Sequence, residues 1–222
     1  MTTRPILFSG AMVRAILDGT KSQTRRIVKP QPESGCKIGT YTTLDSIEWI
    51  TVDGDGPVDA PNITCPYGQP GDRMWVRETW AWYGDITDHE VVLWRADAEY
   101  TLEERGGQPW RPSIHMPRWA SRITLEITGV RVERLQAITE ADAKAEGIER
   151  IHAGCHSAWK NYLFKGDPKK GQEITDKEHR IVGYKSPIAS YQSLWNSING
   201  PGSWDANPLV WVIEFKRSED TK

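Results

Sequence analysis

Cysteine is scarce in this chain of 222 residues, which carries only Cys36, Cys65 and Cys155. An odd number of cysteines with no CxxC pair argues against a disulfide framework and against a ribbon-type zinc site. Cys155 and His156 could supply two metal ligands, but the sequence offers no evident second pair. Free thiols are therefore the simpler interpretation, and we expect no metal and no other cofactor.

Long apolar runs are also missing, and no stretch approaches the length of a membrane span. The first ten residues, MTTRPILFSG, lack the extended apolar core of a secretory signal. Hydrophobic residues make up 38% of the chain and charged residues 26%, which is typical of a soluble globular protein. We therefore expect a cytoplasmic protein with no membrane partner.

Neither sign of charge dominates, since 28 Lys and Arg stand against 30 Asp and Glu for a net charge of −2. This balance does not predict nonspecific binding of nucleic acid by the whole molecule, although a local basic patch is compatible with it. Phenylalanine is rare, with 3 residues, whereas tryptophan is abundant, with 11. We expect most tryptophans to pack in the core, while some could stack on bases.

The apolar pattern predicts several strands with helices between them and no regular βαβ alternation, which is typical of an α+β domain built on a small curved sheet or barrel. Strands are predicted at residues 4–9, 71–83, 90–96, 121–135 and 208–216, and helices at 9–19, 139–147 and 186–198. Ser9, Thr139 and Ser186 are the expected N-terminal caps, with Asp142 completing a capping-box-like start and Pro187 at the first helical position.

Three further expectations concern the segments between these elements. Residues 30–72 are predicted to form a long loop with a small hairpin at SIEWITV, and residues 149–185 a polar excursion. The apolar alternation of 121–135 changes parity near Gly129, which predicts a bulge that bends the sheet. In the strand 71–83, Glu78 shares a face with four apolar residues, so its carboxylate should be paired with a cation or have a raised pKa.

Four segments resemble, in their order, those of ASCH domains: DGTKSQTRRI, GQPGDRMWVRETW, LQAITEADAKAEGI and PLVWVIEFK. The most specific of these elements is G-x-K-x-x-T-x-R, here Gly19, Lys21, Thr24 and Arg26. The resemblance implies a PUA-like small β-barrel with flanking helices, formed by residues 1–222 as a single domain with insertions at about 30–65, 84–120 and 150–185. The long version, with PSIHMPRWASRITLEI, is similar to proteins common in phages and prophages.

The resemblance also implies a partner and an activity. ASCH domains are associated with RNA or nucleosides, and one small member type is an amidohydrolase that removes acetyl from 4-acetylcytidine. Its lysine, its threonine three positions later and its glutamate fall on Lys21, Thr24 and Glu146 here. Other ASCH proteins are associated with ribonuclease activity, so the resemblance leaves open a ribonuclease or an RNA-binding module without chemistry.

Amide hydrolysis needs a nucleophile, a base and donors for the oxyanion. Thr24 could supply the hydroxyl, and Lys21 could take its proton if burial and the neighbouring Arg25 and Arg26 lowered the lysine pKa. Residues 21 and 24 differ in parity along an extended segment, so a turn after Gly19 is required to bring them together. Glu146 ends a short helix and could serve as general acid or base.

The remaining candidates concern substrate binding. Arg25 and Arg26, together with Lys29, could meet phosphates, while Trp80 or Trp119 stacks a base. Glu78 is the rival carboxylate because its strand face is expected to be buried. The simpler alternatives are a solvated cationic face at 21–26, a threonine that only caps a turn, an exposed Glu146 and a Glu78 that only pairs with arginine. His115 could also be a site residue, but we expect a packed loop histidine.

Overall fold

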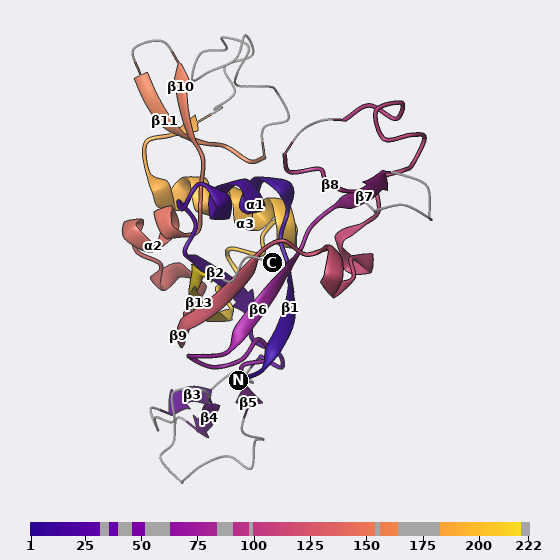
Figure 1. Ribbon diagram of the computed structural model, residues 1–222. Helices are drawn as coiled ribbons and strands as arrows, with labels where there is room; N and C mark the ends of the chain where they lie inside the picture. The colour runs from indigo at the N-terminus through magenta and orange to yellow at the C-terminus, as the bar shows by residue number, and fades with distance from the viewer. Residues whose placement is uncertain are drawn as a thin grey trace. The chain divides into compact units, whose positions relative to one another are not determined.

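The computed structural model describes residues 1–31, 36–39, 46–51, 63–83, 91–97, 100–153, 156–163 and 183–218 (Figure 1). The chain forms two compact units. The first unit comprises Met1–Gly19, Lys37–Val130 and Ile213–Lys222, and the second comprises Thr20–Cys36 and Arg131–Val212.

A five-stranded sheet has the order β1-β6-β9-β13-β2, made of β1 (Thr3–Leu7), β6 (Arg73–Arg77), β9 (Thr124–Arg134), β13 (Leu209–Arg217) and β2 (Gln23–Ile27). β1 runs parallel to β6, and β6 runs antiparallel to β9. The boundary between the units falls within β9 and β13. The chain thus combines a mixed five-stranded sheet with helices in the connections, which is compatible with the α+β class. β9 is continuous over its 11 residues, and the bulge at Gly129 stays a prediction.

The first helix of the first unit, α1 (Gly10–Leu17), confirms its sequence signals. The Ser9 hydroxyl accepts a hydrogen bond from the Met12 amide at 3.5 Å, and Gly19 follows the helix at φ +72°. Val13 and Ile16 are buried as the amphipathic pattern predicts. The helix therefore ends in a turn that redirects the chain into the segment with the G-x-K-x-x-T-x-R element.

The single strand predicted over residues 71–83 is wrong, because the chain changes sheets at Glu78 and Thr79. β6 ends at Arg77, and β7 (Trp80–Tyr83) pairs instead with β8 (Val91–Trp94) in a separate two-stranded sheet. Two short 3₁₀ turns, η1 (Ser113–His115) and η2 (Arg118–Ala120), follow the loop of residues 100–112. Between them the buried Met116 packs with Trp80 and Ala120.

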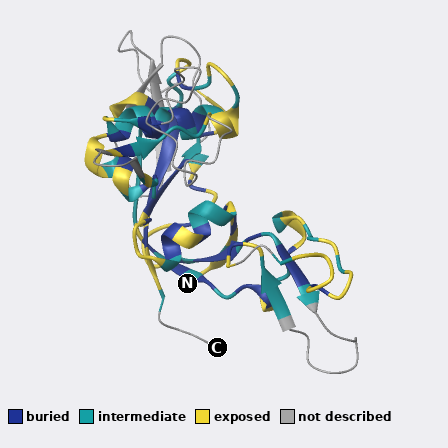
Figure 2. Ribbon diagram, turned by 90° about the horizontal axis from the view of Figure 1, so that it is seen from above, coloured by how far each residue is buried: buried dark blue, intermediate teal, exposed yellow. Residues whose placement is uncertain are grey.

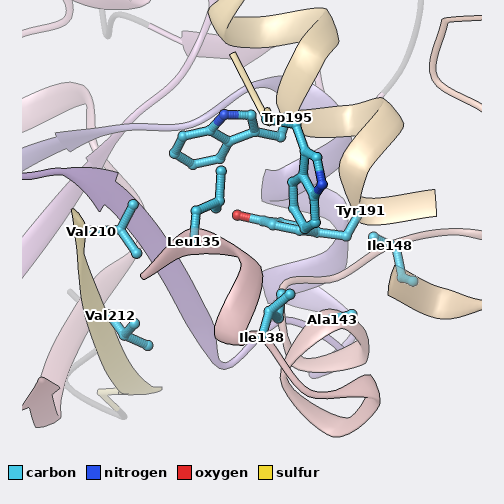
Figure 3. Packing of buried hydrophobic residues seen from close by; sticks show 9 residues of the cluster. Leu135, Ile138, Ala143, Ile148, Tyr191, Trp195, Val210 and Val212 are labelled. Atoms are coloured by element: carbon cyan, nitrogen blue, oxygen red, sulfur yellow. The ribbon is translucent and has the colours of Figure 1, made fainter. Parts of the chain in front are cut away.

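The helices of the second unit pack around a cluster of buried hydrophobic residues (Figure 3). These helices are α2 (Glu140–Ala145) and α3 (Pro187–Asn199), and a 3₁₀ turn, η3 (Leu135–Ala137), precedes α2. The cluster contains Leu135, Ile138, Ala143, Ile148, Tyr191, Trp195, Trp204, Val210 and Val212. Exposed residues gather in turns and at helix ends (Figure 2).

Both segments expected to be mainly loop contain more strand than the sequence indicates. β3 (Cys36–Gly39), β4 (Ser46–Thr51) and β5 (Ile63–Thr64) form one three-stranded sheet, so SIEWITV lies in a sheet and not in an isolated hairpin. β10 (Arg150–Ala153), β11 (His156–Lys160) and β12 (Gly183–Tyr184) form another. In the part of the chain that the structure describes, no helix is long and apolar enough to cross a membrane.

Candidate functional site

The second unit buries a polar cluster where the end of α2 meets the start of β2. Lys21 forms an isolated antiparallel bridge with Glu146, the residue that caps the C-terminus of α2, and the Ser22 amide donates to the Ala145 carbonyl at 2.9 Å. We call this the Glu146 cluster; its members are Lys21, Gln23, Arg25, Arg131, Glu133, Asp142, Glu146 and Tyr191. The main-chain pairing brings together residues 125 positions apart in the sequence.

Lys21 lies at the centre of the cluster with only 3% of its surface exposed. Its Nζ donates to the carbonyl oxygens of Gln23 and Glu146, each at 2.7 Å, and to Glu146 Oε2 at 3.0 Å. Burial lowers the pKa of Lys21, Glu146 opposes that change, and Arg26 and Arg25 lower the pKa further. The predicted direction is confirmed, with burial as the larger cause and the arginines as the smaller one.

Glu146 is 2% exposed and has a cation at each carboxylate oxygen. Oε2 accepts from Lys21, and Oε1 accepts from Arg25 at 3.2 Å. Two buried cations that fix one carboxylate provide the compensation that a charge removed from water requires. The alternative of an exposed Glu146 is wrong.

Arg25 is enclosed by carboxylates. Its terminal nitrogens lie 2.6 Å from Glu133 Oε1, 3.5 Å from Asp142 Oδ2 and 3.2 Å from Glu146 Oε1, while its guanidinium carbon lies 5.9 Å from the ring centre of Tyr191. Burial alone would lower the pKa of Arg25, but Glu146, Tyr191 and Glu133 raise it above its ordinary value. The side chain is fully buried, so it is placed to hold carboxylates and not to meet an external phosphate. Residues 21–26 therefore do not form a solvated cationic face as a group.

The cluster is completed by side chains that the sequence did not single out as site residues. With the Gln23 amide oriented to satisfy both groups, its nitrogen donates to Asp142 Oδ1 at 3.0 Å and its oxygen accepts from Arg131 at 2.9 Å. Arg131 also pairs with Glu133 at 3.2 Å and with Asp142 at 3.0 Å. The alternate positions 131 and 133 on β9 share one face, which is the signal that could have indicated them. The cluster thus contains three cations and three carboxylates: Lys21, Arg25 and Arg131, and Glu133, Asp142 and Glu146.

Thr24 lies in β2 and is 2% exposed. The Gln23 carbonyl that accepts from Lys21 belongs to the peptide group preceding Thr24, so the ammonium lies one peptide unit from this residue. In a strand, residues 23 and 25 face one way and residue 24 the other. Among the described residues, no hydrogen bond joins the Thr24 hydroxyl to Lys21 or Glu146. The structure brings Lys21 and Glu146 into contact and places Thr24 beside them along the chain.

Glu78 and Trp80 belong to the first unit. The Glu78 carboxylate accepts from Arg122 at 3.0 and 3.2 Å, and Arg122 also donates to Asp97 at 2.7 Å. Burial raises the pKa of Glu78, while the hydrogen bond and charge of Arg122 oppose the rise. Both sequence-based alternatives for Glu78, a paired cation and a raised pKa, are therefore confirmed.

The two tryptophans considered for base stacking differ in accessibility. Trp80 is 1% exposed, and Trp82 and Trp119 contact its ring edge-to-face at 5.9 and 5.8 Å. Trp119 is 44% exposed. Stacking on an incoming base would thus fall to Trp119 in this conformation. His115 is exposed in η1, so a packed loop histidine is wrong.

Cys65 is buried, and burial raises the pKa of its thiol. It lines a pocket of about 170 Å³ in the first unit together with Arg4, Thr64, Gly68, Gln69 and Asp72. The side chains of Cys36, Cys155 and His156 lie outside the described residues. Within the part that is described, no group of three or more His, Cys, Asp or Glu side chains could hold a metal ion.

No family model, no curated protein and no solved structure matches this chain. The features of this chain that bear on its function are therefore the geometry of the Glu146 cluster and the motif resemblance.

Proposed function

We propose that the protein hydrolyses an acylated nucleoside of the 4-acetylcytidine type in the cytoplasm, with Lys21, Thr24 and Glu146 as catalytic residues. The observation that carries the proposal is the 3.0 Å contact between the Lys21 ammonium and the Glu146 carboxylate, in a buried position one peptide unit from Thr24. A PUA-like barrel, as the ASCH resemblance implies, is part of this proposal, and the mixed five-stranded sheet is compatible with it.

The contact suits proton transfer because a buried ion pair can exchange its charges for a neutral pair without changing its net charge. Transfer of one proton from Lys21 to Glu146 leaves an amine that can accept the Thr24 hydroxyl proton. Arg25 stays protonated and continues to donate to Oε1 of Glu146.

In the proposed reaction the Thr24 oxygen attacks the acetyl carbonyl carbon while its proton passes to Lys21. The carbon–nitrogen bond then breaks, the exocyclic nitrogen of cytidine takes a proton from the Lys21–Glu146 pair, and an acetyl ester remains on Thr24. Water hydrolyses this ester to acetate and returns Thr24 to its hydroxyl form. Because all three side chains are at most 3% exposed, substrate entry requires the residues that cover them to move.

The test is to incubate the protein with 4-acetylcytidine and to quantify cytidine and acetate. Lys21→Met, Thr24→Val and Glu146→Gln should each lower turnover by about 10²-fold or more, the scale of a lost acid–base or nucleophilic group. Ser22→Ala is the matched control, since Ser22 is exposed between the two candidate residues. Absence of turnover by the wild-type protein, or full activity of Thr24→Val with its fold intact, contradicts the proposal.

The competing proposal is an RNA-binding module without chemistry, or a ribonuclease. It is favoured by the half-buried Arg26 and the exposed Lys29, which follow the buried Arg25 along the same segment. It predicts RNA binding that weakens with salt and is reduced in the double variant Arg26→Ala, Lys29→Ala. RNA length measured after incubation separates binding from cleavage.

A further inference from the structure

The first unit carries a surface on which arginines lie over tryptophan rings. The Arg111 guanidinium carbon is 4.0 Å from the ring centre of Trp82, and those of Arg77 and Arg118 are 4.9 and 5.8 Å from the ring centre of Trp75. We call this the Arg–Trp surface; it comprises Arg77, Trp82, Arg111, Arg118 and Trp119, together with the buried Trp75, whose ring lies near Arg77 and Arg118. Its residues belong to β6, to β7, to the loop of residues 100–112 and to η2; β6 and β7 are labelled in Figure 1.

Buried contacts fix this surface in place. Trp80 and Arg111 exchange two main-chain hydrogen bonds, at 3.2 and 2.8 Å. Arg77 Nε donates to the carbonyl of the fully buried Met116 at 3.0 Å. The buried Trp80 ring contacts the Trp119 ring edge-to-face, with the ring centres 5.8 Å apart. A partner would therefore meet side chains that are already ordered, which reduces the entropy lost on binding.

The surface combines positive charge with exposed apolar groups. The acidic Glu78 and Asp97 are both paired with Arg122. In the described ranges, no carboxylate forms an ion pair with any of the three arginines of the surface. In the two 3₁₀ turns, close to Arg111 and Arg118 in the sequence, Ile114 is 55% exposed and Trp119 is 44% exposed. A cationic surface with exposed apolar side chains stands out on a protein with a net charge of −2.

The ring faces favour a protein over nucleic acid as the partner. Base stacking needs an open aromatic face, but guanidinium groups lie over the rings of Trp75 and Trp82, and Trp80 is buried, so of these four rings only that of Trp119 is open to a base. An exposed isoleucine is an anchor for an apolar side chain and offers a base no hydrogen bond. Tryptophan and arginine are also the residues that dominate binding energy at protein–protein interfaces.

We propose that the Arg–Trp surface binds an acidic protein segment whose apolar side chain packs on Ile114 and Trp119 while its carboxylates pair with Arg77, Arg111 and Arg118. This activity is separate from the proposed hydrolysis, whose residues all lie in the second unit. Stacked guanidiniums keep their N–H edges available, which suits paired recognition of carboxylates.

The experiment is a selection of random 12-residue peptides displayed on phage against the full-length protein, with counter-selection on the double variant Arg111→Glu, Trp119→Ala. The enriched peptides should carry Asp or Glu beside Leu, Phe or Trp. Synthesised with a fluorophore, they should bind the wild-type protein and lose at least tenfold in affinity with Trp119→Ala and with Arg118→Glu. Ile198→Ala is the control, because Ile198 has the same exposed fraction as Ile114, 55%, but lies on α3 in the second unit. Near-ultraviolet circular dichroism checks that each variant is folded.

Three results would overturn the proposal. One is the absence of enrichment over the double variant, or the enrichment of basic peptides. Another is that a 12-residue oligouridylate displaces the peptides and depends on the same side chains, which would make the surface a nucleic-acid site. The last is self-association in sedimentation experiments that Trp119→Ala removes, which would make the occupant a second copy of this chain.

Discussion

Lys21 and Glu78 are both buried ionisable groups, and each is held by charged partners. The Lys21 ammonium has three oxygen acceptors, and the Glu78 carboxylate has two nitrogen donors from one arginine. In both cases burial shifts the pKa in the direction that favours the neutral form, down for Lys21 and up for Glu78, and the charged partner opposes that shift. Each group should therefore leave a measurable pH dependence in the free energy of unfolding.

Lys21→Met should destabilise the protein by about 3 kcal/mol or more near neutral pH, because it leaves buried acceptors without their cation. The pKa of Lys21 in the folded protein lies below its ordinary 10.5. Between these two pKa values the folded protein binds fewer protons at Lys21 than the unfolded chain does, so the free energy of unfolding rises with pH across that interval. Urea unfolding from pH 7 to pH 10 should show the wild-type protein gaining stability relative to Lys21→Met. Parallel curves would contradict the direction of the shift.

Glu78→Gln should show the opposite trend with pH. The pKa of Glu78 in the folded protein lies above its ordinary 4.5. Between these two pKa values the folded protein binds more protons at Glu78 than the unfolded chain does, so the free energy of unfolding rises as the pH falls across that interval. Unfolding experiments between pH 7 and pH 4.5 should show the wild-type protein gaining stability relative to Glu78→Gln. The exposed Glu103→Gln is the control and should follow the wild-type curve.

At the scale of elements, local chemistry predicts the helices and non-local pairing limits the strands. The Thr139 hydroxyl accepts from the Asp142 amide while the Asp142 carboxylate accepts from the Thr139 amide, so the capping box is complete. The polar sequence of β10 and β11 carries no clear alternation, and these strands form through pairing with each other and with β12. Such strands are specified by their partners and cannot be identified from a local pattern.

Thr139→Ala should reduce the free energy of unfolding by about 1 kcal/mol, the usual cost of a lost N-terminal cap. The effect should extend to the Glu146 cluster, because Glu146 caps the C-terminus of α2. Denaturant unfolding measures the loss of stability, and the acetate assay measures any effect on the site. Thr139→Ser keeps the hydroxyl and should retain most of the stability.

Two strand glycines should respond differently to alanine. A Cβ at Gly183 would lie 2.9 Å from both Ala158 Cβ and Ile151 Cδ1, and 3.1 Å from the Trp159 carbonyl oxygen. Gly183→Ala should therefore destabilise the protein by about 1–3 kcal/mol through overpacking. A Cβ at Gly129 would meet the end of the Glu214 side chain at 2.9 Å, and its three nearest atoms all belong to that side chain and none to the backbone. Denaturation midpoints should fall further for Gly183→Ala than for Gly129→Ala.

At the scale of the whole molecule, the mixed α and β content, the helices and the strands β9 and β13 follow from the sequence, whereas the single strand predicted over residues 71–83 does not form. The composition of the candidate site follows only in part. The motif indicates Lys21 and Glu146, which the structure brings into contact. It also offers Arg25 as a phosphate ligand, whereas the structure surrounds that side chain with carboxylates. Glu133 and Asp142 could not be identified as its partners because that contact depends on how β9 and α2 meet β2.

The net charge predicts how the whole protein behaves in solution. The sequence isoelectric point is about 6.2, so electrostatic repulsion between molecules is weakest near that pH. Turbidity measured across the pH range should peak there at low salt. Arg118→Glu changes the net charge by two units and should move the peak to lower pH. A peak at the same pH in both proteins would mean that a local contact controls precipitation.

Glu146 holds Lys21 both through its side chain and through its main-chain carbonyl oxygen. Replacing the glutamate removes only one of these two attachments, since every amino acid supplies the carbonyl. A saturation scan scored on protein abundance should therefore tolerate more replacements at position 146 than at position 21. The same scan scored on acetate release should remove that difference if the proposed hydrolysis takes place, because that reaction uses the carboxylate itself.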